Sequence, residues 1–185
     1  TKWESRGINK MKRLGNIYNK IISRENLELA FDKAKKGKTW QDKVKFAEAH
    51  RKELLDELEI ILQKRQYKTS QYRTKIVYEP KKRTIYILPF YPDRIVQHAI
   101  MNILEPYWDN RMHYHSYACR KGKGQHQGSR QCMKYIKRNP YCLKCDISKF
   151  YPSVNHGIIY KILQRKIKCK YTLELLKEII ESVPG

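Results

Sequence analysis

The segment from Tyr141 to Ser153 constrains the fold and the chemistry of this chain more than any other. Residues 141–147 are mainly apolar and predict a β-strand, with Asp146 close to its end. A strand is rigid, and the backbone leaves the sheet after it, so a carboxylate in this position can hold a divalent cation in a fixed place. The segment therefore predicts the start of a metal-dependent phosphoryl-transfer site with Asp146 as its acid.

A two-metal site needs further carboxylates, and no acidic pair follows Asp146 in a strand-like setting. The later acids Glu174, Glu178 and Glu181 fall in a helical pattern. A lone aspartate can instead cap a turn, but the apolar run before Asp146 and the aromatic residues after it favour catalysis.

The net charge of +22 points to a polyanionic partner, because such self-repulsion destabilises a compact state unless it is neutralised. The basic residues are spread along the chain among 14 tyrosines, a pattern typical of proteins that bind phosphates and stacked bases. An anionic membrane surface is the alternative, but no single amphipathic helix gathers these charges. We therefore expect nucleic acid as the partner, although most single lysines can simply solvate helix faces.

The composition predicts a folded, soluble, cytoplasmic protein of one domain or two small ones. Apolar residues make up 41% of the chain, enough for a core, and neither a membrane-length apolar run nor a leader is present. Five cysteines, mostly in apolar runs, favour a reducing compartment and structural roles. Zinc ligation is the alternative, but no second cysteine pair follows Cys142 and Cys145 at zinc-ribbon spacing, and the set His113, His115 and Cys119 lacks an assigned fourth ligand.

Hydrophobic periodicity predicts an α+β fold in which helices dominate. Ser23 is expected to cap a helix that ends before Gly37, and residues 73–78 and 83–88 are expected to pair as a hairpin. Asp93 is expected to cap a helix that ends before Pro106. The further expected elements are a short helix near 14–21, a long one over 40–65, an aperiodic basic loop at 112–128, a helix at 126–138 and two closing helices.

Three segments in this order resemble the reverse transcriptases of the bacterial retroelement lineage, which includes group II intron and diversity-generating retroelement enzymes. They are Glu79–Ile85 with Asp93–Ala99, then Ser116–His126, then Cys145–Val154. Residues 117–120 and 148–153 are most similar to the diversity-generating type, and retron and abortive-infection enzymes are the alternatives.

The resemblance implies a right-hand polymerase of which only part is present. Residues 1–140 would form the fingers, with a helical N-terminal part, the hairpin near 73–88, the helix 93–105 and the basic loop 112–128. Residues 141–185 would begin the palm with its first catalytic motif. The family's aromatic-x-Asp-Asp hairpin, which carries the other metal ligands, is absent from this sequence, so we expect a fragment that is inactive alone.

The resemblance also assigns roles around the expected active site. Asp146 would bind two Mg²⁺ ions, and the carbonyl of Ile147 would add a ligand. Tyr151 falls where the family carries the aromatic residue that packs beneath the sugar and excludes a 2′-hydroxyl. Phe150 belongs to the same nucleotide-binding segment and is the better candidate for the core, since adjacent residues in extended chain point oppositely.

Basic residues elsewhere are expected to bind phosphate. Resemblance favours Arg83 for a bidentate grip on the nucleotide triphosphate, with Lys81 second. The glycine-rich loop lacks the features of a Walker motif, so a nucleotide-binding loop of that kind is not expected. The loop is instead expected to contact the template backbone through Arg120, Lys121 and Lys123. Two further residues, Arg94 and Gln97, would either contact the template or brace the fingers.

The function that follows from the resemblance is RNA-directed DNA polymerisation. A DNA 3′-hydroxyl would attack the α-phosphate of a deoxynucleoside triphosphate on an RNA template, with Mg²⁺ as cofactor. The partners would be template RNA, primer DNA, deoxynucleoside triphosphates and a small basic accessory protein, with no membrane. The alternative from another class is a non-catalytic basic RNA-binding module or maturase-like piece.

Overall fold

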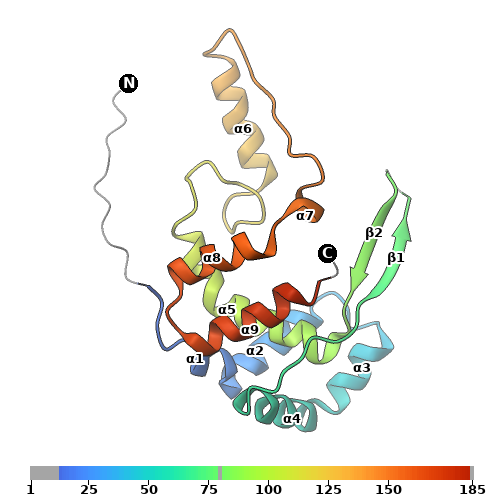
Figure 1. Ribbon diagram of the computed structural model, residues 1–185. Helices are drawn as coiled ribbons and strands as arrows, with labels where there is room; N and C mark the ends of the chain where they lie inside the picture. Colours follow the sequence, from blue (N-terminus) through green and yellow to red (C-terminus); the bar gives the residue numbers. More distant parts are fainter. Residues whose placement is uncertain (1–12, 79–80, 184–185) are drawn as a thin grey trace. The chain divides into compact units, whose positions relative to one another are not determined.

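The structure, a computed structural model, describes residues 13–78 and 81–183 (Figure 1). Helices dominate, and the one sheet within the described residues is a two-stranded antiparallel hairpin, so the fold is α+β as predicted. In chain order the elements are α1 (Tyr18–Ile22), α2 (Arg24–Lys35), α3 (Asp42–Ala49), α4 (Arg51–Gln63), β1 (Arg73–Val77), β2 (Arg83–Ile87), the π-helical turn η1 (Phe90–Arg94), α5 (Ile95–Asp109), α6 (Gln125–Ile136), α7 (Phe150–Ser153), α8 (His156–Lys166) and α9 (Lys170–Glu181).

The chain divides into two compact units. The first contains the residues up to Ile103 together with those from Val154 onward, and the second contains Leu104–Ser153. Helix α5 continues from the first unit into the second. The division predicted at residue 140 coincides with neither boundary. No helix in the described ranges combines the length and the apolar character that crossing a membrane requires.

Helix α2 begins and ends where the sequence predicts. The side chain of Ser23 accepts a hydrogen bond from the backbone N–H of Asn26 at 3.3 Å, which satisfies one of the free donors of the first turn. Beyond the last turn, Gly37 adopts φ = 72°, a left-handed conformation that glycine takes at little cost. The apolar face of α2 buries Leu27 and Phe31 completely.

The long helix predicted over residues 40–65 is two helices, α3 and α4. The chain bends at His50, which has φ = −109° and ψ = 26°, outside the usual helical values. The bend places Arg51, the first residue of α4, where its guanidinium reaches two acids of α2. Periodicity alone did not show this break, because apolar residues of both helices continue one pattern.

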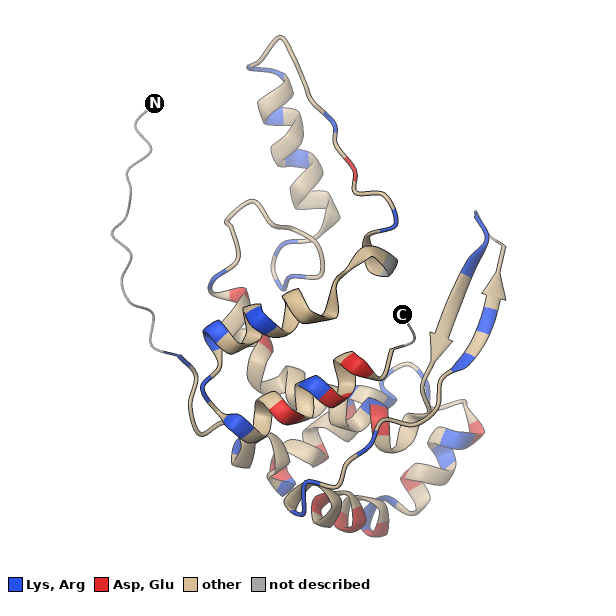
Figure 2. Ribbon diagram, viewed as in Figure 1, with Lys and Arg blue, Asp and Glu red and all other residues tan. Residues whose placement is uncertain are grey.

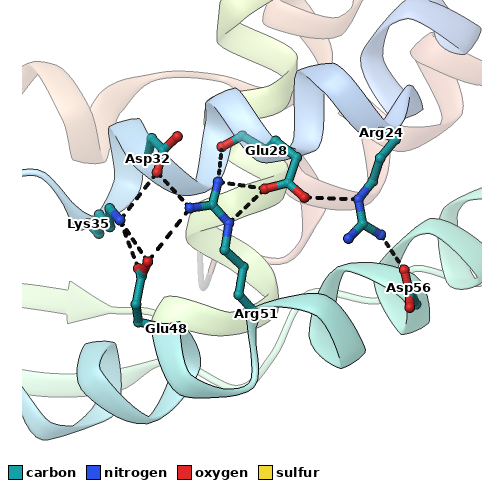
Figure 3. A network of polar contacts seen from close by, with 7 residues as sticks. All are labelled: Arg24, Glu28, Asp32, Lys35, Glu48, Arg51 and Asp56. Atoms are coloured by element: carbon teal, nitrogen blue, oxygen red, sulfur yellow. Dashed lines mark hydrogen bonds and ion pairs between the residues drawn. The ribbon is translucent and has the colours of Figure 1, made fainter.

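A network of ion pairs joins α2, α3 and α4 (Figure 3). Arg51 donates from Nε to Glu28 at 2.7 Å and from Nη1 to Asp32 at 2.9 Å, and its guanidinium lies 4.7 Å from the centre of the Phe31 ring. The hydrogen bond from Arg51 lowers the pKa of Asp32. The remaining contacts are those of Glu48 with Lys35 and Arg51, of Lys35 with Asp32, and of Arg24 with Glu28, Asp56 and Glu59.

A short backbone pairing joins the two chain segments that make up the first unit. Leu14 forms a parallel bridge with Ile167, which is fully buried, and the backbone N–H of Leu14 donates to the carbonyl of Lys166 at 2.8 Å. Helix α9 follows this pairing and buries Leu173 and Leu175. The residues from Val154 onward therefore belong to the fold of the N-terminal helices.

The start of α5 differs from the prediction. Asp93 does not cap the helix: its carboxylate turns inward, is fully buried, and accepts hydrogen bonds from the hydroxyl of Tyr67 at 2.7 Å and the backbone N–H of Ser70 at 3.0 Å. The helix also does not end before Pro106 but runs to Asp109. At that end Arg120 donates to the carbonyl of Asp109 at 3.0 Å, which satisfies one of the free acceptors of the last turn.

The strand predicted over residues 141–147 is not formed in the described structure. This segment is extended but has no regular hydrogen-bonded partner, and Tyr141 and Leu143 are 92% and 88% exposed. Strand structure requires backbone pairing on at least one side, which sequence composition cannot supply. The segment leads directly from α6 to the single helical turn α7.

Candidate active site and nucleic-acid interface

The predicted site residues fall on both units, and the catalytic candidate Asp146 lies in the second. It is exposed, and its Oδ1 accepts a hydrogen bond from the backbone N–H of Ile147 at 2.9 Å. The chain then turns at Lys149, where φ is +47°, and forms α7, with the N–H of Ser153 bonded to the carbonyl of Lys149 at 3.0 Å. The extended segment and the turn together present the carboxylate of Asp146 at the surface.

Both aromatic residues after Asp146 are accessible. Tyr151 is 88% exposed and Phe150 is 51% exposed, and their rings meet edge to face at 5.4 Å. The interpretation of Phe150 as a core residue is therefore wrong for this structure, because a helical turn of four residues buries neither ring. The nucleotide-binding roles predicted for both residues stay predictions.

The described residues contain no group of three or more histidine, cysteine, aspartate or glutamate side chains able to hold a metal ion. Asp146 is the one acidic residue among residues 141–153, and the binding of Mg²⁺ by its carboxylate and the backbone carbonyl of Ile147 stays a prediction. The zinc alternative at His113, His115 and Cys119 also gains no support. All five cysteines are free; four of them are exposed and Cys169 is partly exposed, so their predicted structural roles do not come from burial in the core.

Arg120 is held inside the basic loop between α5 and α6. Its Nε donates to Oδ1 of Asp109 at 2.7 Å, and its Nη1 donates to the carbonyls of His113 and Ser116, each at 3.1 Å. The side chain is only 11% exposed, and its hydrogen bond lowers the pKa of Asp109. Arg120 therefore braces the loop, and its predicted contact with the template backbone stays a prediction.

Lys123 also has partners within this loop. Its ammonium group donates to the carbonyl of Tyr114 and lies 4.2 Å from the centre of the Tyr114 ring and 5.5 Å from that of Tyr117. The imidazole of His115 lies 2.9 Å from the hydroxyl of Tyr117 through Nδ1 and 2.9 Å from that of Tyr135 through Nε2. Lys121, by contrast, is exposed.

In the first unit the hairpin β1–β2 has two unlike faces. Its register pairs Arg73 with Ile87 and Val77 with Arg83, so one face carries Arg73, Lys75 and Arg83. The other face carries uncharged residues, namely Thr74, Ile76, Thr84 and Tyr86. Lys81 is exposed at the turn, and the neighbouring Glu79 and Pro80 lie outside the described residues. Figure 2 shows the basic residues along both strands.

The second predicted pair in the first unit, Arg94 and Gln97, is in direct contact. The guanidinium of Arg94 donates to Oε1 of Gln97 at 3.2 Å, and both side chains are partly exposed. Two further basic groups lie near Arg94. Desolvation and the charge of Arg94 lower the pKa of Lys38, and desolvation followed by Arg94, Lys38 and Lys33 lowers the pKa of His98. This clustering of positive charge, which the sequence spacing did not reveal, favours an anionic ligand.

A cleft of about 160 Å³ between the end of α4 and α9 also lies in the first unit. Its charged groups have partners: Lys68 pairs with Glu178 at 2.7 Å, and the Arg65 guanidinium lies 4.3 Å from the Tyr171 ring. These charges of the cleft are therefore paired within the chain.

A basic α+β protein with exposed tyrosines, a cationic hairpin and one surface carboxylate after an extended segment has the character of a nucleic-acid-binding protein. Comparison of the sequence makes the class specific. The profile of the family described as "Reverse transcriptase (RNA-dependent DNA polymerase)" matches residues 63–183, which is more than half of the chain. The chain belongs to this family, which confirms the resemblance found in its motifs.

Curated relatives agree with this assignment. Protein YkfC of Escherichia coli (strain K12) is 27% identical over 100 residues, covering 51% of this chain and 26% of the relative. The mitochondrial nuclear intron maturases 2 and 1 of Arabidopsis thaliana are 28% identical over 90 residues and 25% identical over 93 residues. Those matches cover 49% and 50% of this chain but 12% and 13% of the maturases. The chain thus spans about a quarter or less of the length of these relatives.

Proposed function

We propose that this chain is the fingers and the first part of the palm of a retroelement RNA-directed DNA polymerase of the diversity-generating type. The observation that carries the proposal is the family match over residues 63–183, within which Asp146 is an exposed carboxylate after an extended segment. The match also includes the cationic hairpin and the basic loop. These are the parts that bind polyanions in the proposed activity.

In the proposed reaction the residues of this chain bind and orient the substrates. Asp146 would hold Mg²⁺ together with the carbonyl of Ile147, and the ions would activate the primer 3′-hydroxyl and neutralise charge on the α-phosphate. On the hairpin, Arg83 and Lys81 would bind the triphosphate. Tyr151 would lie beneath the sugar, with Phe150 beside it.

The nucleic acid would contact both units. Arg94 and Gln97, with Lys38 nearby, would bind template phosphates in the first unit, and Lys121 would do so in the second. The proposed partners are template RNA, primer DNA, deoxynucleoside triphosphates and a small basic accessory protein, in a cytoplasmic setting without a membrane. Within residues 1–185 the motif resemblance assigns only the carboxylate of Asp146 to the ions, and one carboxylate cannot hold two ions, so we expect the isolated chain not to polymerise.

The second candidate is a maturase-like RNA-binding module without polymerase activity. It is favoured by the names of two relatives, which are intron maturases. The basic residues of the loop and the hairpin would serve RNA binding equally well in that case.

The test is primer extension on an RNA template by the intact protein that contains this chain, with Asp146→Asn as the variant. Glu105→Gln is the matched control, since it changes another exposed carboxylate of the same unit. We expect extension by the wild type and by Glu105→Gln but not by Asp146→Asn, with equal RNA affinity in all three. RNA binding without extension by the wild type would instead support the maturase-like module.

A further inference from the structure

The loop between α5 and α6 presents one aromatic ring to solvent. Tyr114 is 70% exposed, although its ring has neighbours on two sides. The ammonium group of Lys123 lies 4.2 Å from the ring centre, over one face, and the His115 ring meets it edge to face at 5.0 Å. The other face of the Tyr114 ring is therefore open to solvent.

The loop that carries this ring is held by side chains on both sides of it. Arg120 ties its start to the end of α5 through Asp109, His113 and Ser116. His115 links the loop to α6 through the hydroxyl of Tyr135. The backbone that carries Tyr114 is thus held in place, which lowers the entropy that a ligand must remove on binding.

The charge of the second unit indicates what stacks on the open face. Residues 104–153 contain ten lysine and arginine residues against three acidic ones. An exposed aromatic face among cations suits a base of a single-stranded nucleic acid, because the base stacks on the ring while its phosphates meet the charges. A protein partner would have to be strongly acidic and to offer an aromatic or aliphatic side chain at the same point.

We propose that Tyr114 is a stacking platform for one base of a single-stranded nucleic acid, and that Lys123 and Arg120 are positioning residues for this ring. Lys123 covers the inner face of the ring and holds the Tyr114 carbonyl, and Arg120 fixes the loop at its base. This inference rests on the proposed nucleic-acid function and deepens it. The basic residues of the loop alone suggest phosphate binding, and the inference adds base stacking as a second role of the loop.

The first experiment measures the affinity of the intact protein for single-stranded oligouridylate and for inorganic polyphosphate, a polyanion without bases. Tyr114→Leu should weaken oligouridylate binding by about 5- to 150-fold, the usual effect of removing one stacking ring, and should leave polyphosphate binding unchanged. Tyr114→Phe should restore oligouridylate binding. The matched control is Tyr141→Leu, which removes a ring that is 92% exposed in the same unit.

The outcomes decide the proposal. Equal oligouridylate affinity in Tyr114→Leu and wild type overturns it, as does an equal loss of oligouridylate and polyphosphate binding, or a wild type that binds no oligouridylate. Tight Tyr114-dependent binding of an acidic peptide in place of oligouridylate would also overturn it and would identify a protein partner. Thermal unfolding of each variant shows that the fold is retained.

A second experiment separates positioning from phosphate contact at Lys123. Lys123→Met and Lys134→Met each remove one cation of the second unit, so both should weaken polyphosphate binding equally. Only Lys123→Met should cause an additional loss with oligouridylate, and Lys123→Arg should restore it, because a guanidinium also covers an aromatic face. Equal losses in the two methionine variants overturn the positioning role. Primer extension tests the proposed function separately. If the intact protein extends primers and its Tyr114→Leu variant binds oligouridylate as tightly as the wild type, this inference alone is rejected.

Discussion

The hydroxyl of Tyr67 donates a 2.7 Å hydrogen bond to the fully buried carboxylate of Asp93. The same oxygen of Asp93 accepts from the backbone N–H of Ser70, and its other oxygen has no hydrogen-bond partner among the described residues. Burial, reinforced by the neighbouring carboxylate, raises the pKa of Tyr67 well above its ordinary value. The pair joins the segment that leads into the hairpin to the turn that begins α5.

Tyr67→Phe should lower the free energy of unfolding by about 1–3 kcal/mol, because it leaves a buried carboxylate with one donor fewer. Urea denaturation measures this loss. The matched control is Tyr91→Phe, which removes a hydroxyl whose acceptor, Glu57, is exposed to water and can be solvated again. We expect the control to cost less than Tyr67→Phe, and equal losses would contradict the structural role of the Asp93 carboxylate.

Asp93 also shows what the sequence could not predict. A polar residue between a proline and an apolar periodic run is typical of a helix cap, so local pattern gave the wrong role. Its real partners lie 23 and 26 residues earlier in the chain. By contrast, the cap at Ser23, the glycine after α2 at Gly37 and the pairing of the two hairpin strands depend on residues close in sequence, and local rules predicted these correctly.

The same distinction between local and distant contacts applies to the candidate site. Asp146 and Tyr151 lie five residues apart in one short segment, so resemblance of that segment is enough to single them out, and both are exposed. Their roles stay predictions. The contacts of Arg120 and Lys123 within their own loop could not be predicted, because they depend on the geometry of an irregular backbone. The composition of the loop indicates only its positive charge. The missing strand at 141–147 has a related cause, since pairing needs a partner that periodicity does not name.

Arg51→Lys should destabilise the protein, because a lysine cannot make the forked contacts of Arg51 to Glu28 and Asp32 (Figure 3). Nor can it cover the Phe31 ring in the same way. The side chain is about a quarter exposed, so we expect a loss of about 1 kcal/mol. Urea denaturation at neutral pH measures it. Lys45→Met, which breaks an ion pair that is mostly exposed, is the control and should change stability little.

The difference between Arg51→Lys and wild type should depend on pH. The hydrogen bond from Arg51 lowers the pKa of Asp32 in the folded state, so its contribution is present above the unfolded pKa, about 4, and is lost as the pH falls through the folded pKa. We therefore expect the two stability curves to converge as the pH falls below about 4. If the stability difference between wild type and Arg51→Lys stays constant below this pH, the contact of Arg51 with Asp32 is not its source.

Arg120→Lys should loosen the loop between α5 and α6 while keeping its charge. The variant loses the fork that binds Asp109, His113 and Ser116, so amide hydrogen exchange in residues 110–124 should accelerate. Exchange in α2, in the other unit, is the internal reference and should not change. An unaltered loop would mean that Arg120 is not needed for its structure and would return this residue to the phosphate-binding role expected from the sequence.

The last prediction concerns sugar selection by the intact enzyme. Tyr151→Val should raise ribonucleotide incorporation, because the proposed position of the ring is the space that a 2′-hydroxyl would need, while deoxynucleotide use should suffer less. Phe150→Ala should cost only about 1 kcal/mol of stability, since the ring is half exposed and not in the core. Parallel extension assays with ribonucleotides and deoxynucleotides, together with urea denaturation, measure both effects. If Phe150→Ala relaxes discrimination while Tyr151→Val leaves it unchanged, the sugar lies against Phe150, and the roles assigned to the two rings must be exchanged.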